Sequence, residues 1–117
     1  GVFQAVQEAA IAALRSEPAV VERLRAMYRE RRDVLVPGLG DIGLPCDPPA
    51  GTFYVWCPVP RGQTASTLAT RCLTEAGVVV TPGNGFGESG EGYIRLTLCS
   101  PTERLREAVD RLRSLRL

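Results

Sequence analysis

The chain has 117 residues, a formal net charge of +1, 44% hydrophobic residues and 23% charged residues. These values are typical of one ordinary globular domain, and so small a net charge would not attract nucleic acid or a membrane surface. All 14 basic residues are Arg, with no Lys and no His. This excludes from the chain a Schiff-base lysine, a P-loop lysine and any catalytic triad that contains His.

Two helices are predicted at the start of the chain. Apolar residues at helical spacing predict one helix over 2–15 and another over 18–36, which Pro37, Gly38 and Gly40 would end. The polar side of the second helix is expected to be a solvated face and carries Glu22, Arg25, Arg29 and Arg32. Residues 37–50 read as a turn-rich connection with a short strand at 42–44, and no apolar run is long enough to span a membrane.

The remainder of the chain alternates between strand and helix patterns. Residues 52–57 are aromatic and β-branched and predict a strand, and 64–76 predict a helix capped by Thr64 and closed by Gly77. A short apolar strand is expected at 78–81, a glycine-rich loop at 82–92 and an alternating strand at 93–98. The inward side of a last helix over 101–115 is expected to carry Leu105, Ala108, Val109, Leu112 and Leu115.

The order of these elements, α-α-β-α-β-β-α, predicts an α+β fold. The third strand can insert between the first two, antiparallel to both, which gives a two-layer sandwich with helices on one face of a three-stranded sheet. We expect residues 1–117 to form a single domain, with 1–36 as a helical linker and 37–117 as the sandwich.

Four cysteines, Cys46, Cys57, Cys72 and Cys99, lack the short spacing of metal ligands, and no His is present to complete a zinc site. Cys57 and Cys99 lie in apolar, strand-like contexts. We therefore expect reduced and mostly buried thiols rather than a disulfide framework, and we predict no metal site.

Three stretches of the chain carry short motifs that occur together in one known family. Residues 49–56, PAGTFYVW, resemble the strand GxFY-[LV]-W of the class I pyridoxal-phosphate-dependent aminotransferases. Residues 80–83 and 86–96 resemble its element PGxxFGxxGEGYxR[LIV], and residues 1–14 resemble the helix that follows its large domain. The ordered set is similar to the C-terminal small domain of a fold type I enzyme, in the branch of LL-diaminopimelate and aspartate aminotransferases. Because the chain also begins without Met, we expect a piece of a larger two-domain enzyme.

Arg95 is the one candidate for substrate binding. Strand alternation directs Ile94 and Leu96 to one face and Arg95 to the other, and a guanidinium can grip a carboxylate through two parallel hydrogen bonds. The resemblance implies that Arg95 binds the α-carboxylate of the substrate. The alternative is a surface ion pair between Arg95 and Glu88, Glu91 or Glu103.

Other conspicuous residues of these motifs have structural interpretations. A strand follows the glycine-rich loop, so a dinucleotide-binding turn is not expected, and a connection that needs positive φ is. The resemblance places this loop at the mouth of the active site. Gly51 is interpreted as a close backbone approach and Phe53 as a core aromatic, whereas Tyr54 and Trp56 fit either the core or an interface.

The resemblance also implies what this chain lacks. Pyridoxal phosphate would be bound by the large domain, so no catalytic and no cofactor-binding residue is predicted here, and the chain alone would be inactive. The implied enzyme is a cytoplasmic homodimer in amino-acid biosynthesis that moves an amino group between an amino acid and a 2-oxo acid. Two alternatives stay open: a carbon–sulfur lyase or related synthase with the same fold, and a stand-alone module that binds a small acid through Arg95.

Overall fold

The computed structural model describes residues 1–16 and 18–117 of the chain. Its helices are α1 (Gln4–Leu14), α2 (Pro18–Gly40), α3 (Ala65–Ala76) and α4 (Thr102–Leu112), and its strands are β1 (Tyr54–Pro58), β2 (Thr81–Pro82) and β3 (Tyr93–Thr97). Short 3₁₀ helices follow β2 and α4, namely η1 (Gly83–Phe86), η2 (Glu88–Gly90) and η3 (Arg113–Leu115). This order of helices and strands agrees with the predicted one.

The sheet has the order β1-β3-β2, and β3 is antiparallel to both neighbours, as predicted. The strand predicted at 78–81 pairs only at Thr81–Pro82. The N–H of Val78 cannot pair with a neighbouring strand, because it donates to the carbonyl oxygen of Cys72 (2.9 Å) as part of the turn that closes α3. The strand predicted at 42–44 is absent, since these residues form a tight turn with Gly43 at φ +88° directly after α2.

Helix α2 does not end before Pro37, as the sequence predicted, but continues to Gly40. Proline removes one hydrogen bond of the helix interior. Burial of Leu35 and Leu39, which are 1% and 0% exposed, outweighs this loss. A Cβ on Gly38 would lie 3.0 Å from the methyl carbons of Val109 in α4. The glycine that was expected to break the helix therefore allows the two helices to pack closely.

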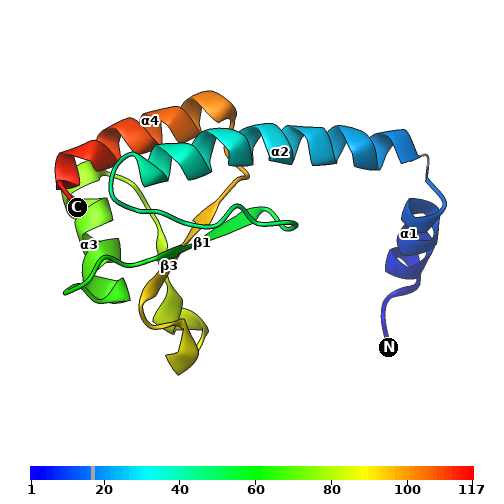
Figure 1. Cartoon of the computed structure of the whole chain (residues 1–117). Coiled ribbons are helices and arrows are strands. Elements are labelled where there is room, and N and C mark those ends of the chain that lie inside the picture. Colours follow the sequence, from blue (N-terminus) through cyan, green and yellow to red (C-terminus); the bar gives the residue numbers. More distant parts are fainter. Residues whose placement is uncertain (17) are drawn as a thin grey trace.

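Helices cover one face of the sheet, and the core lies between the two layers. In Figure 1, α4 runs alongside α2 above the strands. Val55 and Cys57 of β1 and Ile94 and Leu96 of β3 face the helices and are at most 7% exposed. The predicted inward side of the last helix is also buried, except that Ala108 is only half-buried.

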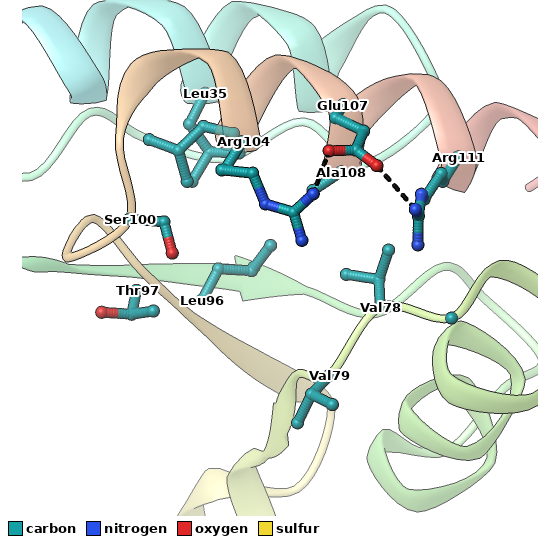
Figure 2. A pocket seen from close by; sticks show the side chains of 12 residues that line it. Leu35, Val78, Val79, Leu96, Thr97, Ser100, Arg104, Glu107, Ala108 and Arg111 are labelled. Atoms are coloured by element: carbon teal, nitrogen blue, oxygen red, sulfur yellow. Dashed lines mark hydrogen bonds and ion pairs between the residues drawn. The ribbon is translucent and has the colours of Figure 1, made fainter.

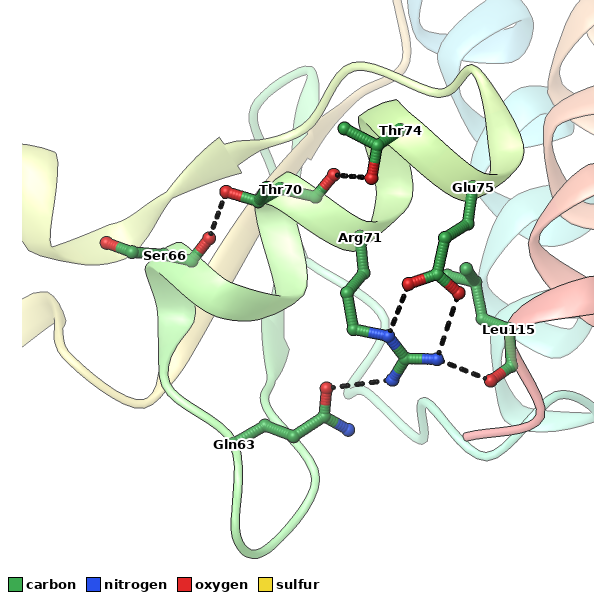
Figure 3. Close-up of polar contacts among 7 residues, drawn as sticks. All are labelled: Gln63, Ser66, Thr70, Arg71, Thr74, Glu75 and Leu115. Atoms are coloured by element: carbon green, nitrogen blue, oxygen red, sulfur yellow. Dashed lines mark hydrogen bonds and ion pairs between the residues drawn. The ribbon is translucent and has the colours of Figure 1, made fainter.

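Helix α3 has the caps that the sequence predicted. The hydroxyl oxygen of Thr64 accepts from the N–H of Thr67 (3.1 Å), and Gly77 takes the left-handed conformation, φ +64°, that ends the helix. Figure 3 shows how Arg71 then ties α3 to the end of the chain. Its guanidinium donates to Glu75 (2.9 Å), to Gln63 (3.1 Å) and to the carbonyl oxygen of Leu115 (2.8 Å).

The first helix and the first half of α2 make no core. No residue of α1 is buried, and Figure 1 shows α1 beyond the far end of α2 from the sandwich. Exposed apolar side chains follow this arm: Val2, Phe3, Val6, Ile11, Leu14, Val20, Val21 and Leu24. The apolar side of these helices therefore packs against no other element among residues 1–16 and 18–117.

All four cysteines are free thiols, in agreement with the sequence prediction. Cys57 and Cys72 are fully buried and Cys46 is half-buried, but Cys99 is exposed, so its predicted burial is wrong. Cys99 lies two residues after the last residue of β3, where the chain leaves the sheet for α4. The apolar context of a strand end does not ensure a position under the helices.

Because of Cys72, the stability of the fold is expected to decrease at alkaline pH. Burial raises the pKa of its thiol from 9.0 to about 11. Between these values the unfolded chain releases a proton that the folded chain keeps. The free energy of unfolding is therefore expected to fall as the pH rises from about 9 to about 11, whereas the contribution of this thiol is intact below about pH 9.

Urea unfolding at about pH 8 and about pH 10.5 measures this loss. Cys72→Ala is expected to lose less stability between the two conditions than the wild-type chain, because the other titrating groups are common to both. Equal losses in the two proteins would contradict the assignment to Cys72. Cys99→Ala is the control and should behave like wild type, because Cys99 is exposed.

Candidate functional site

The face of the sheet opposite the helices carries the polar and aromatic residues of the motifs. Because side chains alternate along a strand, burial of Val55, Cys57, Ile94 and Leu96 directs their neighbours to this open face. The open face presents Tyr54, Trp56, Pro58, Tyr93, Arg95 and Thr97. The alternation predicted for Arg95 is therefore confirmed.

Arg95 lies at the centre of this open face, opposite Trp56 of β1 on one side and Thr81 of β2 on the other. Two aromatic rings approach its guanidinium. The central carbon of the guanidinium is 3.9 Å from the ring centroid of Tyr54 and 4.3 Å from that of Phe86. At such distances the positive charge is attracted by the electrons of both rings, and the flat group is held against apolar surface.

The alternative ion pairs for Arg95 do not form within the described part of the chain. None of Glu88, Glu91 and Glu103 pairs with Arg95 in this part of the chain. The N–H groups of Arg95 donate to no protein acceptor among the same residues. The carboxylate of Glu91 is directed elsewhere, since its Oε1 accepts from the backbone N–H of Ala65 (2.8 Å) and of Gly92 (3.1 Å). Arg95 thus combines a half-buried stem with a forked set of unused donors.

An aromatic cluster continues from Arg95 across the open face. The ring of Trp56 stacks on that of Tyr93, with centroids 5.6 Å apart, and forms a T-shaped pair with that of Phe86, with centroids 5.9 Å apart. Trp56 is 39% exposed and Phe86 is 52% exposed. Such rings usually face a partner, a ligand or another domain when they gather on one surface.

Two structural interpretations from the sequence are wrong next to this cluster. Phe53 is not a core aromatic but 41% exposed, with its ring 4.5 Å from that of Tyr54. A Cβ on Gly51 would meet no atom within 4 Å, so this glycine marks no close approach. Both residues precede β1, although the carbonyl oxygen of Phe53 still accepts from the N–H of Leu98 (2.8 Å). The ring of Phe53 lies 6.1 Å from that of Tyr28 in α2, at the edge of the core, next to the half of α2 that is exposed.

Arg32 is also placed differently from the prediction. It was assigned to the solvated side of α2, but its side chain is only 27% exposed. Its Nη1 donates to the carbonyl oxygen of Pro49 (3.2 Å). Arg32 therefore holds the segment that enters β1 against α2, whereas the other predicted surface residues Glu22, Arg25 and Arg29 are exposed.

The glycine-rich loop brings Phe86 to Arg95. It folds into η1 and η2, and its base is closed where Gly83 and Gly90 touch. A Cβ on Gly83 would lie 2.1 Å from the carbonyl oxygen of Gly90, and one on Gly90 would lie 2.0 Å from that of Gly83. Positive φ, which the sequence predicted for this connection, occurs at Gly87 (120°) and Gly92 (84°). No role was predicted for Phe86, and its place in the Phe-Gly pair of the motif was the one available signal.

A shallow groove on the helical side has no comparable set of unused groups. Figure 2 shows the carboxylate of Glu107 between the guanidinium groups of Arg104 and Arg111, above Val78 and Val79. The distance from Glu107 to Arg111 is 2.6 Å, and Glu107 also pairs with Arg104. These charges are solvent-accessible and both guanidinium groups pair with the one carboxylate, so we assign no binding role to this groove.

Two further features are absent from residues 1–16 and 18–117. No group of three or more Cys, Asp or Glu side chains is arranged to hold a metal ion. None of the helices described there combines the length and apolar character needed to cross a membrane.

Comparison with known proteins places this geometry in a family. The family described as aminotransferase class I and II matches residues 2–112. An LL-diaminopimelate aminotransferase of Oleidesulfovibrio alaskensis is 54% identical over 115 residues, which is 98% of this chain and 30% of the relative.

Solved structures agree with this match. An apo structure of BacF from Bacillus subtilis is 39% identical, has a TM-score of 0.87, and is matched over 100% of this chain and 30% of its own. The aromatic aminotransferase of Pyrococcus horikoshii is 36% identical with a TM-score of 0.85, over 94% of this chain and 30% of its own. The chain thus spans about 30% of the length of the proteins it matches. By its sequence and its fold, the chain belongs to the class I and II aminotransferases.

Proposed function

We propose that this chain is the C-terminal small domain of a pyridoxal-phosphate-dependent aminotransferase and that Arg95 binds the substrate carboxylate. Residues 1–36 would serve as the helical connection to the large domain, and 37–117 as the sandwich that carries Arg95. The complete enzyme would exchange an amino group between an amino acid and a 2-oxo acid, as a cytoplasmic homodimer.

The observation that carries this proposal is the set of contacts around the guanidinium of Arg95. Its guanidinium lies against two rings and has no protein acceptor among the described residues. An amino acid and its 2-oxo acid share a carboxylate, and one forked guanidinium can bind that group in both. Fixing the carboxylate also fixes the orientation of the neighbouring Cα atom, where the proton is removed.

The residues of this chain do not fit the cofactor itself. Pyridoxal phosphate supplies the electron sink of transamination and requires a lysine amine, and the chain contains no Lys. Catalytic and cofactor-binding residues are therefore assigned to the remainder of the complete enzyme. The contribution of this chain is to bind and orient the substrate.

The exposed apolar arm of α1 and α2 supports the proposed arrangement. Its apolar side chains have no partner among the described residues, and relatives of about three times the length have chain available to cover them. An interface with the large domain or the second subunit would bury this surface, since large exposed apolar patches usually mark interaction sites.

LL-diaminopimelate is the proposed amino donor, because the curated relatives with 50–55% identity carry the name LL-diaminopimelate aminotransferase. The test is to purify the complete enzyme and follow glutamate formation from 2-oxoglutarate, with LL-diaminopimelate or aspartate as donor. Glutamate formed with LL-diaminopimelate supports the proposal, and glutamate formed only with aspartate assigns the aspartate branch. A parallel assay supplies a thioether of cysteine and no 2-oxo acid, and release of a thiol there would instead identify a carbon–sulfur lyase.

A further inference from the structure

We propose that Phe86 is a positioning residue for the carboxylate site: its ring, with that of Tyr54, fixes the guanidinium of Arg95 in the orientation that receives the substrate. This inference rests on the carboxylate role proposed for Arg95. It assigns to the glycine-rich loop a task in substrate binding that does not require the loop to touch the substrate.

The reason to expect a positioning device is the freedom of the arginine side chain. An unpaired Arg has many rotamers, and holding one of them costs conformational entropy each time a ligand binds. Neither a hydrogen bond nor an ion pair restrains Arg95 within residues 1–16 and 18–117. Two rings, at 3.9 and 4.3 Å, pack against its guanidinium there.

The two rings come from different parts of the fold. Tyr54 lies on β1, one diagonal step from Arg95 on the same face, so the sheet sets its place. Phe86 comes from the loop between β2 and β3, and its ring also meets Trp56 at 5.9 Å. The position of Phe86 therefore depends on how firmly its loop is held.

Contacts near both ends of the loop hold it to the start of α3. The amide of Asn84 donates to the hydroxyl oxygen of Ser66 (3.0 Å), and Glu91 accepts from the N–H of Ala65 (2.8 Å). The contact between Gly83 and Gly90 closes the base between these two anchors. Phe86 is thus held from α3, while its ring remains 52% exposed. An exposed aromatic ring at the end of a fixed loop contributes little to the core, and this favours a role at the guanidinium.

The test uses the complete enzyme and a saturated carboxylic acid with the carbon chain of the amino donor. This acid has no amino group, so its inhibition constant reports on carboxylate binding. Phe86→Leu is expected to raise that constant, and the KM of donor and 2-oxo acid, roughly three- to twentyfold. The value of kcat at saturating substrate should change less. Phe86→Tyr keeps an aromatic ring at this position and should therefore have the wild-type constants. Because Phe86 is half exposed, Phe86→Leu should still fold, which thermal unfolding checks, and Gly85→Ala is the loop control.

A double-mutant cycle with Arg95→Ala separates positioning from a general structural effect. If Phe86 acts through Arg95, adding Phe86→Leu to Arg95→Ala should not raise the inhibition constant further. Full additivity of the two changes, or an unchanged constant in Phe86→Leu alone, would overturn the inference while the role of Arg95 stands. An unchanged constant in Arg95→Ala would overturn both proposals, because Phe86 would then have no carboxylate ligand to position.

Discussion

Replacement of Arg95 by Ala in the complete enzyme is expected to lower kcat/KM for the amino donor and the 2-oxo acid by roughly 30- to 1000-fold. Removing one partner of a close charge pair costs about 2–4 kcal/mol, and each 1.4 kcal/mol is a tenfold change. Both half-reactions should be affected alike because both substrates carry the same carboxylate. Steady-state kinetics with each substrate varied in turn measures the effect.

Arg95→Lys distinguishes a forked contact from a simple positive charge. Lys keeps the charge but cannot offer two parallel N–H donors, so most of the loss should remain. Arg113→Ala is the matched control, because Arg113 is 52% exposed and pairs only with Asp110 among the residues described. Wild-type kinetics in Arg95→Ala would remove Arg95 from the site, and full activity in Arg95→Lys would show that charge alone is enough.

Replacement of Gly83 or Gly90 by Ala is expected to lower the free energy of unfolding of the chain by about 3 kcal/mol. In each case the new Cβ would lie 2.0–2.1 Å from a backbone oxygen of the other glycine. Both glycines are buried, and the atoms that clash belong to the backbone. No side-chain rotation can relieve the contact, so the base of the loop must open. Urea unfolding of the wild type and the two variants measures the loss.

Gly85 provides the control for this prediction within the same loop. A Cβ there would meet no atom within 4 Å, and its φ does not lie in the left-handed region. Gly85→Ala should therefore be neutral or stabilise the chain slightly, by reducing the freedom of the unfolded state. Equal losses at Gly83, Gly85 and Gly90 would show that the loop responds to any added side chain, and that the contact at its base is not special.

Local patterns were sufficient for most of the architecture and for the face of the sheet on which Arg95 lies. Strand alternation at 93–98 fixed which face Arg95 occupies, and the caps at Thr64 and Gly77 are formed by the residues themselves and their near neighbours. The absence of Lys is a fact of composition and settles that no lysine chemistry occurs in this chain.

Long-range packing explains where the local patterns failed. Pro37 and Gly38 have helix-breaking propensities, but burial of Leu35 and Leu39 and the approach of Val109 keep them helical. In this helix, interactions between distant segments exceed a preference of about 1–3 kcal/mol. The shortening of the predicted strand at 78–81 has a local cause instead, because the closing turn of α3 uses the N–H of Val78.

The surroundings of Arg95 also show which features local sequence decides and which features long-range packing decides. The order of residues along β3 places the guanidinium on the open face, since strand periodicity is a property of neighbours in sequence. Its two rings come from residues 54 and 86, and the second arrives through a loop anchored on α3. That convergence depends on sheet register and loop closure, which join segments distant in the chain. For this reason the pattern of residues predicted the face on which Arg95 lies but not the contact between Arg95 and Phe86.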